Sequence, residues 1–450
     1  MIVHRSAVSA FTQDFPDREF KLMNAPARPR FPALSISVLN VPKSATLAIN
    51  EKSRQLQREG RDIIRLGLGQ SPFPVPDIMV RELRSYARAK DYMAVQGYLP
   101  LRDAIAGFIQ RTEHLHRSAS DVIVGPGSKE LLFGLQLVMD CDLVLPAPSW
   151  VSYQPQAKLL GKQVHWLECR AEDGWKLTAD ALQQHCQNHP ERQQLLILNS
   201  PNNPSGACFS EAELKSLATV AQAHNVIILS DEIYSELHFS GQHISIARFY
   251  PQGTIISNGI SKWAGAGGWR LGFFIFPPEL HAVLELMIVV ASETFTSVSA
   301  PIQMASIRAF EDSTEMLDYI HACRSIMRYI GERFHTLLGG YGLQLVKPEG
   351  GFYALVDFEH YRKPLQNLGI NSAQVLCQTM LEQCGIAALP GSDFGLHQGL
   401  QVRFALVDFD SVELLQQTIR HGGQLTETHP PALEHLFSAA IRLGDWVQKL

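Results

Sequence analysis

Short apolar runs, each four to six residues long, recur through the middle of the chain and alternate with helix-like stretches. Most of these runs are apolar at consecutive positions, which is typical of strands that helices cover on both faces. The pattern therefore predicts an α/β domain with a mostly parallel, seven-stranded sheet between helices. The seven runs are Asp121–Gly125, Asp142–Pro146, Gln163–Leu167, Leu195–Asn199, Asn225–Ser230, Thr254–Ser257 and Leu271–Phe276.

The pattern becomes helical from about residue 310, and two short β-rich runs, Pro348–Tyr353 and Gln401–Ala405, follow among helices. This order predicts a second, smaller α+β unit. Near the C-terminus, apolar residues recur at helical spacing, which predicts a docked amphipathic helix. These apolar positions are Leu433, Leu436, Phe437, Ala440, Leu443 and Val447.

Residues 1–33 have no convincing period and contain four prolines, so we expect a leader or arm there. We expect a small domain from residues 34–80 and 310–424 and a large domain from residues 81–309. Residues 425–450 would then be a C-terminal helical extension.

Composition narrows the class of protein. The 450 residues are 46% hydrophobic and 18% charged with a net charge of −5, which favours a globular protein of two or three domains that binds a small molecule. No basic block suggests nucleic acid as a partner, and no apolar run reaches the roughly 18 residues that span a membrane. The seven cysteines form no C-x-x-C pair, which favours reduced thiols and a cytoplasmic location.

Polar residues follow several of the predicted strands, at the sheet edge where α/β proteins bind ligands. Four signals occur in a fixed order: Asn199–Gly206, Ser230–Tyr234, Ser257–Lys262 with Arg270 eight residues later, and Val402–Phe404. Their joint order and spacing resemble the fold-type I pyridoxal-phosphate enzymes, in particular the class I/II aminotransferase family. The resemblance runs from about Leu34 to Leu415. It implies that pyridoxal 5'-phosphate is the cofactor and that the large domain binds it.

The resemblance implies the roles of four residues around the cofactor ring. Lys262 matches the lysine that forms the resting Schiff base and moves the α-proton, and it lies in a glycine-rich stretch. Asp231 matches the carboxylate that keeps the ring nitrogen protonated. Tyr234 and Asn203 match donors to the cofactor's phenolic oxygen. Without the family context, Lys262, Asp231 and Asn203 would be read as a surface lysine, a helix cap and a turn residue, respectively.

A phosphate requires backbone donors and positive charge, and the run Gly125–Glu130 leaves a strand and enters a helix. Neither a Walker A motif nor G-x-G-x-x-G occurs, so nucleotide binding is disfavoured. The resemblance implies a phosphate cradle to which the backbone of Ser128 and Lys129 and the side chains of Ser261 and Arg270 contribute. Gly259 departs from the serine that many relatives carry three residues before the lysine.

The resemblance assigns further residues to the ring, the substrate and the partner subunit. Trp150 matches the aromatic side chain that stacks on the ring, although a tryptophan is more often simply core. Arg403 matches the arginine that holds the substrate's α-carboxylate, a task suited to a planar bidentate donor. Gly69 matches a backbone donor to the same carboxylate, and Trp150 and Asn203 would also border the substrate. The segment that contains Gly69 departs from the common family pattern at Gln70–Pro72.

The resemblance also implies a homodimer with shared active sites. Tyr92 would reach the neighbouring subunit's phosphate, and Thr294–Val298 would line the partner's site. We expect a cis peptide bond at Asn203–Pro204, because such bonds persist where a tight turn fixes a functional side chain. The histidines form no metal-ligand spacing with the cysteines, so we expect no metal.

The expected function is a ping-pong aminotransferase that moves an amino group from an L-amino acid to a 2-oxo acid such as 2-oxoglutarate. A lyase, decarboxylase or synthase on the same fold is the alternative, and a non-catalytic binding protein is disfavoured by the full residue set. The run Val41–Asn50, with Lys43, resembles the bacterial aspartate/prephenate aminotransferase subgroup. In that subgroup a lysine at the position of Lys129 approaches the substrate's distal carboxylate.

An acidic substrate pair is therefore expected. Two alternatives remain open. The Lys129 side chain could point into solvent, and Trp150, Trp263 and Phe352 could shape an apolar pocket for aromatic donors.

Overall fold

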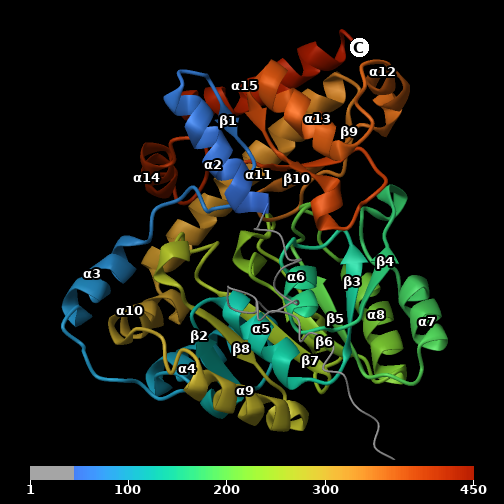
Figure 1. Cartoon of the computed structure of the whole chain (residues 1–450). Coiled ribbons are helices and arrows are strands. Elements are labelled where there is room, and N and C mark those ends of the chain that lie inside the picture. Colours follow the sequence, from blue (N-terminus) through green and yellow to red (C-terminus); the bar gives the residue numbers. More distant parts are fainter. Residues whose placement is uncertain (1–44) are drawn as a thin grey trace, which may run out of the picture. The chain divides into compact units, whose positions relative to one another are not determined.

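The structure, a computed structural model, describes residues 45–450, and its largest element is a seven-stranded sheet (Figure 1). The strand order is β2-β8-β7-β6-β5-β3-β4. Each predicted run overlaps one strand of this sheet, and the strand ends differ from the run ends by at most two residues, so the fold expected from the apolar pattern is confirmed. The strands are β2 (Val122–Gly125), β3 (Asp142–Ala147), β4 (Val164–Glu168), β5 (Gln194–Asn199), β6 (Ile227–Asp231), β7 (Thr254–Gly259) and β8 (Gly272–Ile275).

The sheet is mostly parallel, because only β8 runs against its neighbours β2 and β7. Consecutive strand residues pack on opposite faces. Leu143 and Leu145 of β3 join one apolar cluster, with helix residues such as Leu135, whereas Val144 joins another with Leu214. The consecutive apolar pattern therefore has the expected physical cause, which is burial on both faces.

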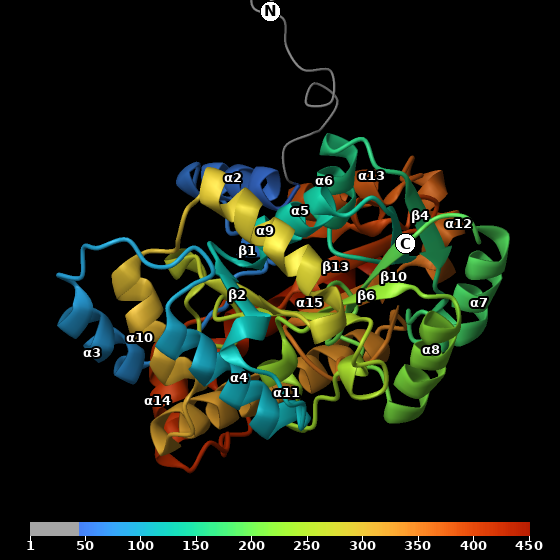
Figure 2. The ribbon, with the colours of Figure 1, turned by 90° about the horizontal axis from the view of Figure 1, so that it is seen from below.

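Helices form the layers on either side of the sheet. Seen from below, α5 and α9 lie on one side and α4 and α8 on the other (Figure 2). The helices up to residue 340 are α2 (Ala45–Arg58), α3 (Asp77–Tyr86), α4 (Leu99–Glu113), α5 (Ser128–Val138), α6 (Tyr153–Leu159), α7 (Ala179–Asn188), α8 (Glu211–Ala223), α9 (His281–Glu293), α10 (Ala300–Phe310) and α11 (Thr314–Gly340). Those that follow are α12 (Arg362–Asn367), α13 (Ala373–Thr379), α14 (Val412–Arg420) and α15 (Glu434–Val447).

A second sheet has the order β12-β13-β10-β9 and is antiparallel throughout. The expected run Gln401–Ala405 is a strand of this sheet, whereas the other strand begins at Tyr353, the last residue of the expected run Pro348–Tyr353. A further pair joins β1 to β11 in parallel, which links two segments that are far apart in the sequence. The strands are β1 (Ile64–Arg65), β9 (Gln344–Leu345), β10 (Tyr353–Asp357), β11 (Ile386–Ala387), β12 (Leu389–Pro390) and β13 (Gln401–Ala405).

The predicted C-terminal helix is α15, and its apolar stripe packs against α11 and β1. Leu436, Ala440, Leu443 and Val447 are buried as expected. Among the described residues, no helix is both long and apolar enough to cross a membrane. The expected leader, residues 1–33, and Lys43 lie outside the described residues.

The prediction of a cis bond at Asn203–Pro204 was wrong. Among the described residues, cis peptide bonds occur at Ala147–Pro148 and Ser200–Pro201. Asn203 is instead held by its backbone N–H, which donates to Oδ1 of Asn199 at 2.8 Å. The turn is thus fixed by a side-chain acceptor and needs no cis bond at Pro204.

Candidate active site

A cavity of about 470 Å³ lies at the carboxyl ends of the sheet strands. β5 ends at Asn199, β6 at Asp231 and β7 at Gly259, and the residues at or just after these ends face the cavity. Among its lining residues, Asp231 is the only carboxylate, and it faces three basic side chains. The lining comprises Gly69, Gln70, Ser128, Lys129, Trp150, Tyr153, Asn199, Asn203, Asp231, Ile233, Tyr234, Ser261, Lys262, Gly267, Gly268 and Arg270.

Lys262 presents its amine to this cavity from the loop after β7. Its Nζ donates to the carbonyl oxygen of Gly69 at 2.7 Å. Burial, together with the nearby positive charge of Arg403, lowers the pKa of Lys262 to about 8. A large fraction of this amine is therefore neutral near pH 8, and a neutral amine is a nucleophile and a proton acceptor.

Asp231 is buried at the end of β6 and is held by two neighbours. The hydroxyl of Tyr153 donates to its Oδ2 at 2.6 Å, and the amide of Asn199 donates to its backbone oxygen at 2.8 Å. Burial raises the pKa of Asp231 to about 6, while the bond from Tyr153 acts in the opposite direction. A cation placed against this carboxylate would favour its ionised form.

Tyr234, Tyr353 and Arg403 form a packed group beside Lys262. The hydroxyls of Tyr234 and Tyr353 lie 2.9 Å apart, and the Arg403 guanidinium lies 4.8 Å from the Tyr353 ring centroid. One Nη of Arg403 donates to the carbonyl oxygen of Gly67. Its Nε is buried and has no hydrogen-bond partner among the described residues. That N–H is an unused donor in a buried, positively charged position.

The first turn of α5 and Arg270 form a concave group of donors. Gly127 precedes the helix with φ 90°, and a Cβ there would lie 2.2 Å from Nη2 of Arg270. Arg270 is fixed by bonds to the carbonyl oxygens of Gly267 and Pro126 at 2.8 and 3.1 Å. A helix N-terminus beside a guanidinium is a favourable environment for an anion.

Two glycines explain how closely β7 and β8 approach this cradle. A Cβ on Gly259 would lie 2.8 Å from the backbone oxygen of Leu271, so the serine that the resemblance leads one to expect has no room here without a shift. A Cβ on Gly272 would lie 2.2 Å from the backbone nitrogen of Ser128. The missing hydroxyl therefore reflects a close backbone contact between the strands.

Lys129 follows Ser128 in the first turn of α5, and its side chain lies at the cavity. Its Nζ lies 5.0 Å from the ring centroid of Trp150. Burial lowers the pKa of Lys129, and the charge of Arg270 lowers it further. The side chain thus lines the cavity beside an aromatic ring.

Asn203 carries a second unused polar atom, because its buried Oδ1 has no hydrogen-bond partner among the described residues. This oxygen and Nε of Arg403 suit a ligand that both donates and accepts hydrogen bonds.

Most of the expected site residues meet at this cavity, but two do not line it. Arg403 is 1% exposed and packs against the Tyr353 ring, and Tyr92 is 92% exposed and is not among the residues that line the cavity. The residues that meet at the cavity are Gly69, Ser128, Lys129, Trp150, Asn203, Asp231, Tyr234, Ser261, Lys262 and Arg270.

Sequence reasoning missed Tyr153, Asn199 and Tyr353. Tyr153 stands three residues after Trp150, and Asn199 opens the Asn-Ser-Pro-Asn-Asn-Pro run, so their positions beside marked motifs were the available signals. Tyr353 ends the run Pro348–Tyr353, which the sequence marked only as β-rich and not as part of a site.

Comparisons with known proteins show which family this chain resembles in sequence and in fold. The family model "Aminotransferase class I and II" matches residues 61–419. An aspartate aminotransferase of Geobacillus stearothermophilus is 31% identical over 86% of this chain and 98% of its own length. The aspartate/prephenate aminotransferase of Thermus thermophilus is 30% identical over 86% of this chain and 98% of its own length. A solved aspartate aminotransferase from Thermus thermophilus with maleate has a TM-score of 0.77 and 29% identity, and it covers 87% of this chain and 99% of its own.

Proposed function

The chain belongs to the aminotransferase class I and II family, and from this premise we propose that it uses pyridoxal 5'-phosphate to move the amino group of an acidic L-amino acid to a 2-oxo acid. The observation that carries the proposal is the charge of the cavity, in which three basic side chains surround one carboxylate. Such a site suits a dianionic phosphate together with a dicarboxylate.

The residues present fit the proposed cofactor. Lys262 would carry it covalently, and the first turn of α5, Ser261 and Arg270 would hold its phosphate. The cradle between the start of α5 and Arg270 supports this fit, because a Cβ on Gly127 would lie 2.2 Å from Nη2 of Arg270 and glycine leaves that space open. When bound, the cofactor supplies an electron-withdrawing ring that stabilises negative charge at the substrate's α-carbon.

The chain's own groups would then do the positioning and the proton transfer. Asp231, oriented by Tyr153, would hold a proton on the ring nitrogen, and its burial strengthens that ion pair. Tyr234, fixed by Tyr353, would donate from its hydroxyl. Nζ of Lys262, once displaced, would take and return the α-proton, a role that its lowered pKa suits.

Two cations would bind the two ends of an acidic substrate. Arg403 would hold the α-carboxylate, because its buried guanidinium has an unused donor at Nε. Lys129, whose Nζ lies 5.0 Å from the ring centroid of Trp150, would approach the distal carboxylate. The solved relative carries maleate, which is a dicarboxylate, and that supports the assignment.

The function is tested by kcat/KM for aspartate and phenylalanine, each with 2-oxoglutarate, in the wild type and in Lys129→Ala. We expect the variant to lose roughly ten- to a hundredfold for aspartate, because a charge-assisted bond contributes about 1.5–3 kcal/mol. Activity with phenylalanine should stay nearly constant. Lys158→Ala, a lysine substitution in α6, is the matched control and should change neither value.

Equal losses for both substrates would mean that Lys129 serves the cofactor and not the substrate. No amino transfer from either amino acid in the cofactor-loaded wild type would contradict the proposed substrate class. In that case, an absorbance screen against the other amino acids would identify the donor.

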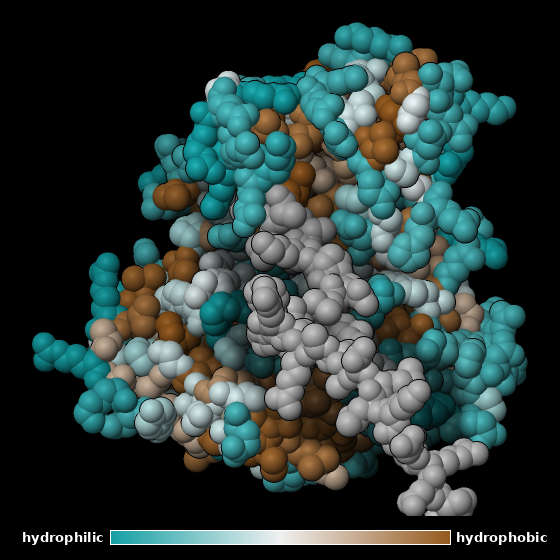
Figure 3. Space-filling view, viewed as in Figure 1, coloured by the Kyte–Doolittle hydropathy of each residue, from teal (hydrophilic) through white to brown (hydrophobic). Residues whose placement is uncertain are grey.

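We further propose that the protein works as a homodimer. Its α9 is apolar around most of its circumference: Leu284 and Met287 are buried, whereas Leu286 and Val289 are 51% and 58% exposed. Apolar side chains gather at the lower edge of the view over this helix (Figure 3). An apolar face of this kind supports contact with a second copy, and exposed Tyr92 would then reach the partner's phosphate site.

A further inference from the structure

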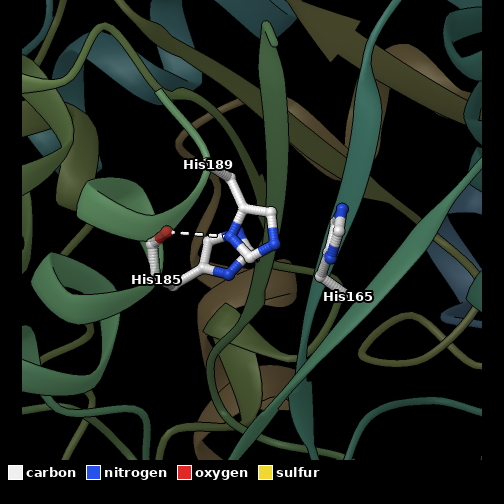
Figure 4. A group of neighbouring side chains, drawn as sticks. All are labelled: His165, His185 and His189. Carbon is white, nitrogen blue, oxygen red and sulfur yellow. Dashed lines mark hydrogen bonds between the residues drawn. The ribbon is translucent and has the colours of Figure 1, made fainter. Parts of the chain in front are cut away.

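A cluster of three histidines lies at the far edge of the large sheet, and none of them lines the cavity. His165 is on the edge strand β4, His185 is in α7, and His189 is the residue that follows α7 (Figure 4). One ring nitrogen of each lies within 4.8 Å of those of the other two. The sequence separation hid this cluster, because His165 is 20 residues from the His-x3-His pair.

The backbone places these side chains for chelation. His185 lies in the last turn of α7 and His189 directly follows that helix, and their rings stack with centroids 4.5 Å apart. The ring centroids of His165 lie 5.0 and 4.5 Å from those of His185 and His189. His165 is tilted to both of the other rings and does not stack on either, so stacking does not explain its position, whereas a shared ligand would bring all three rings together.

Hydrogen bonds to neighbouring oxygen atoms hold two of the rings in place. His165 Nε2 lies 3.2 Å from Oδ2 of Asp142, and the ring of His189 bonds through Nδ1 to the backbone oxygen of His185 at 3.0 Å. Within residues 45–450, Nδ1 of His165 and Nε2 of His189 make no hydrogen bond, so both can bind a ligand. Nε2 of His185 is buried, in a residue only 6% exposed, and it has no hydrogen-bond partner among the described residues.

We propose that His165, His185 and His189 bind a divalent transition-metal ion of the zinc class. Imidazole nitrogen suits zinc, and three protein ligands leave a fourth position for water. A zinc–nitrogen distance of about 2.0–2.1 Å places the ligand atoms of a tetrahedral site roughly 3.4 Å apart. Ring rotations that move the nitrogens by about an ångström would therefore bring all three within binding distance of one ion. Asp142 then acts as the carboxylate that orients a ligating histidine.

The test uses the full-length, cofactor-loaded protein, stripped of metal with EDTA and titrated with zinc chloride against a chromophoric chelator. We expect one equivalent of zinc to bind. The double variant His185→Gln/His189→Gln should lose this equivalent, and Asp142→Asn should weaken it roughly ten- to a hundredfold. His224→Gln, at the end of α8, is the matched control and should bind zinc as the wild type does.

Cobalt(II) provides a measurement that needs no variant, because tetrahedral cobalt with nitrogen ligands gives visible absorption bands. We expect these bands in the wild type and their loss when one equivalent of zinc is added. Zinc binding that is equal in the wild type and the folded double variant would overturn the proposal. So would a wild type that retains no zinc and shows no cobalt bands.

Discussion

At the scale of single residues, Lys262 shows how a buried amine becomes reactive. Its pKa is lowered to about 8 because burial and neighbouring cations disfavour the charged form. Below pH 8 most of the amine is protonated, and above pH 8 most of it is neutral. In an ordinary lysine, half of the amine becomes neutral only near pH 10.4.

We therefore expect the rate at which cofactor-free protein captures pyridoxal phosphate at Lys262 to rise with a midpoint near pH 8 and then to level off. Borohydride trapping between pH 6 and 10, followed by peptide mass spectrometry, measures this rate for each lysine. Exposed Lys90 is the internal control for non-specific labelling, and its peptide should carry far less label than the peptide of Lys262. A midpoint shared by both peptides, or labelling at another buried lysine, would contradict the assignment.

Tyr153 is a second residue whose effect can be isolated. Burial raises the pKa of Asp231 to about 6, and the Tyr153 hydroxyl opposes this rise. Removing the hydroxyl in Tyr153→Phe should raise the pKa further, so the acidic limb of the kcat/KM profile should move to higher pH. The free energy of unfolding should fall by about 1.5–3 kcal/mol.

Tyr319→Phe is the matched control, because its buried hydroxyl donates to the carbonyl oxygen of Pro74 at 2.9 Å and does not face Asp231. This variant should lose about 0.5–1.5 kcal/mol of stability and keep the wild-type pH profile. Equal profiles for the two variants would show that Tyr153 does not influence the reactive centre.

At the scale of elements, the start of α5 couples backbone geometry to anion binding. Gly127 has φ 90° and ψ 152°, a region that only glycine adopts readily, and a Cβ there would meet the Arg270 guanidinium. We expect Gly127→Ala to weaken pyridoxal phosphate binding roughly ten- to a hundredfold, since the displaced guanidinium loses a charge-assisted bond. Fluorescence titration of the cofactor-free protein measures this change.

Gly161→Ala separates strain from displacement, because Gly161 also has a positive φ of 67° but no atom within 4 Å of a Cβ. That variant should lose about 1–2 kcal/mol of stability and bind the cofactor normally. If both variants bound the cofactor equally, Arg270 would have no part in holding the phosphate.

The same scale shows what the sequence could predict. All seven strands were found, because burial on both faces leaves consecutive apolar residues in each run. The stripe of α15 was equally visible, since helical spacing alone reveals it. The hydrogen bonds among the site residues could not be predicted from the sequence, because Tyr153 contacts Asp231 across 78 residues and Tyr234 contacts Tyr353 across 119. Such pairings depend on how the elements pack.

The turn after β5 was partly misjudged for a related reason. The Asn-Pro run marks a tight turn, but the cis bond lies at Ser200–Pro201 and not at Asn203–Pro204. The acceptor that holds Asn203 is Asn199 at the strand end, which local turn preferences do not reveal. The domain boundaries at residues 80 and 309 and the cytoplasmic location stay predictions.

At the scale of the whole molecule, assembly decides whether the proposed site is complete. If two copies meet through the apolar face of α9, charge placed there should separate them. We expect Leu286→Asp/Val289→Asp to sediment as a monomer with little activity, whereas the wild type sediments as a dimer. Leu317→Asp, at a leucine of α11 that is 43% exposed, is the matched control and should remain a dimer.

Shared sites make a sharper prediction, because lesions in two different chains can complement each other. We expect Lys262→Ala and Tyr92→Ala to be inactive separately at limiting cofactor. After mixing, unfolding and refolding, half of randomly assorted dimers are hybrids, and each hybrid has one site with an intact Lys262 and an intact Tyr92 from the partner. Activity should therefore return to roughly a quarter of the wild-type value. If Tyr92 acted within its own chain, every site would keep one lesion and the mixture would stay inactive, which would contradict the shared site while leaving the dimer itself intact.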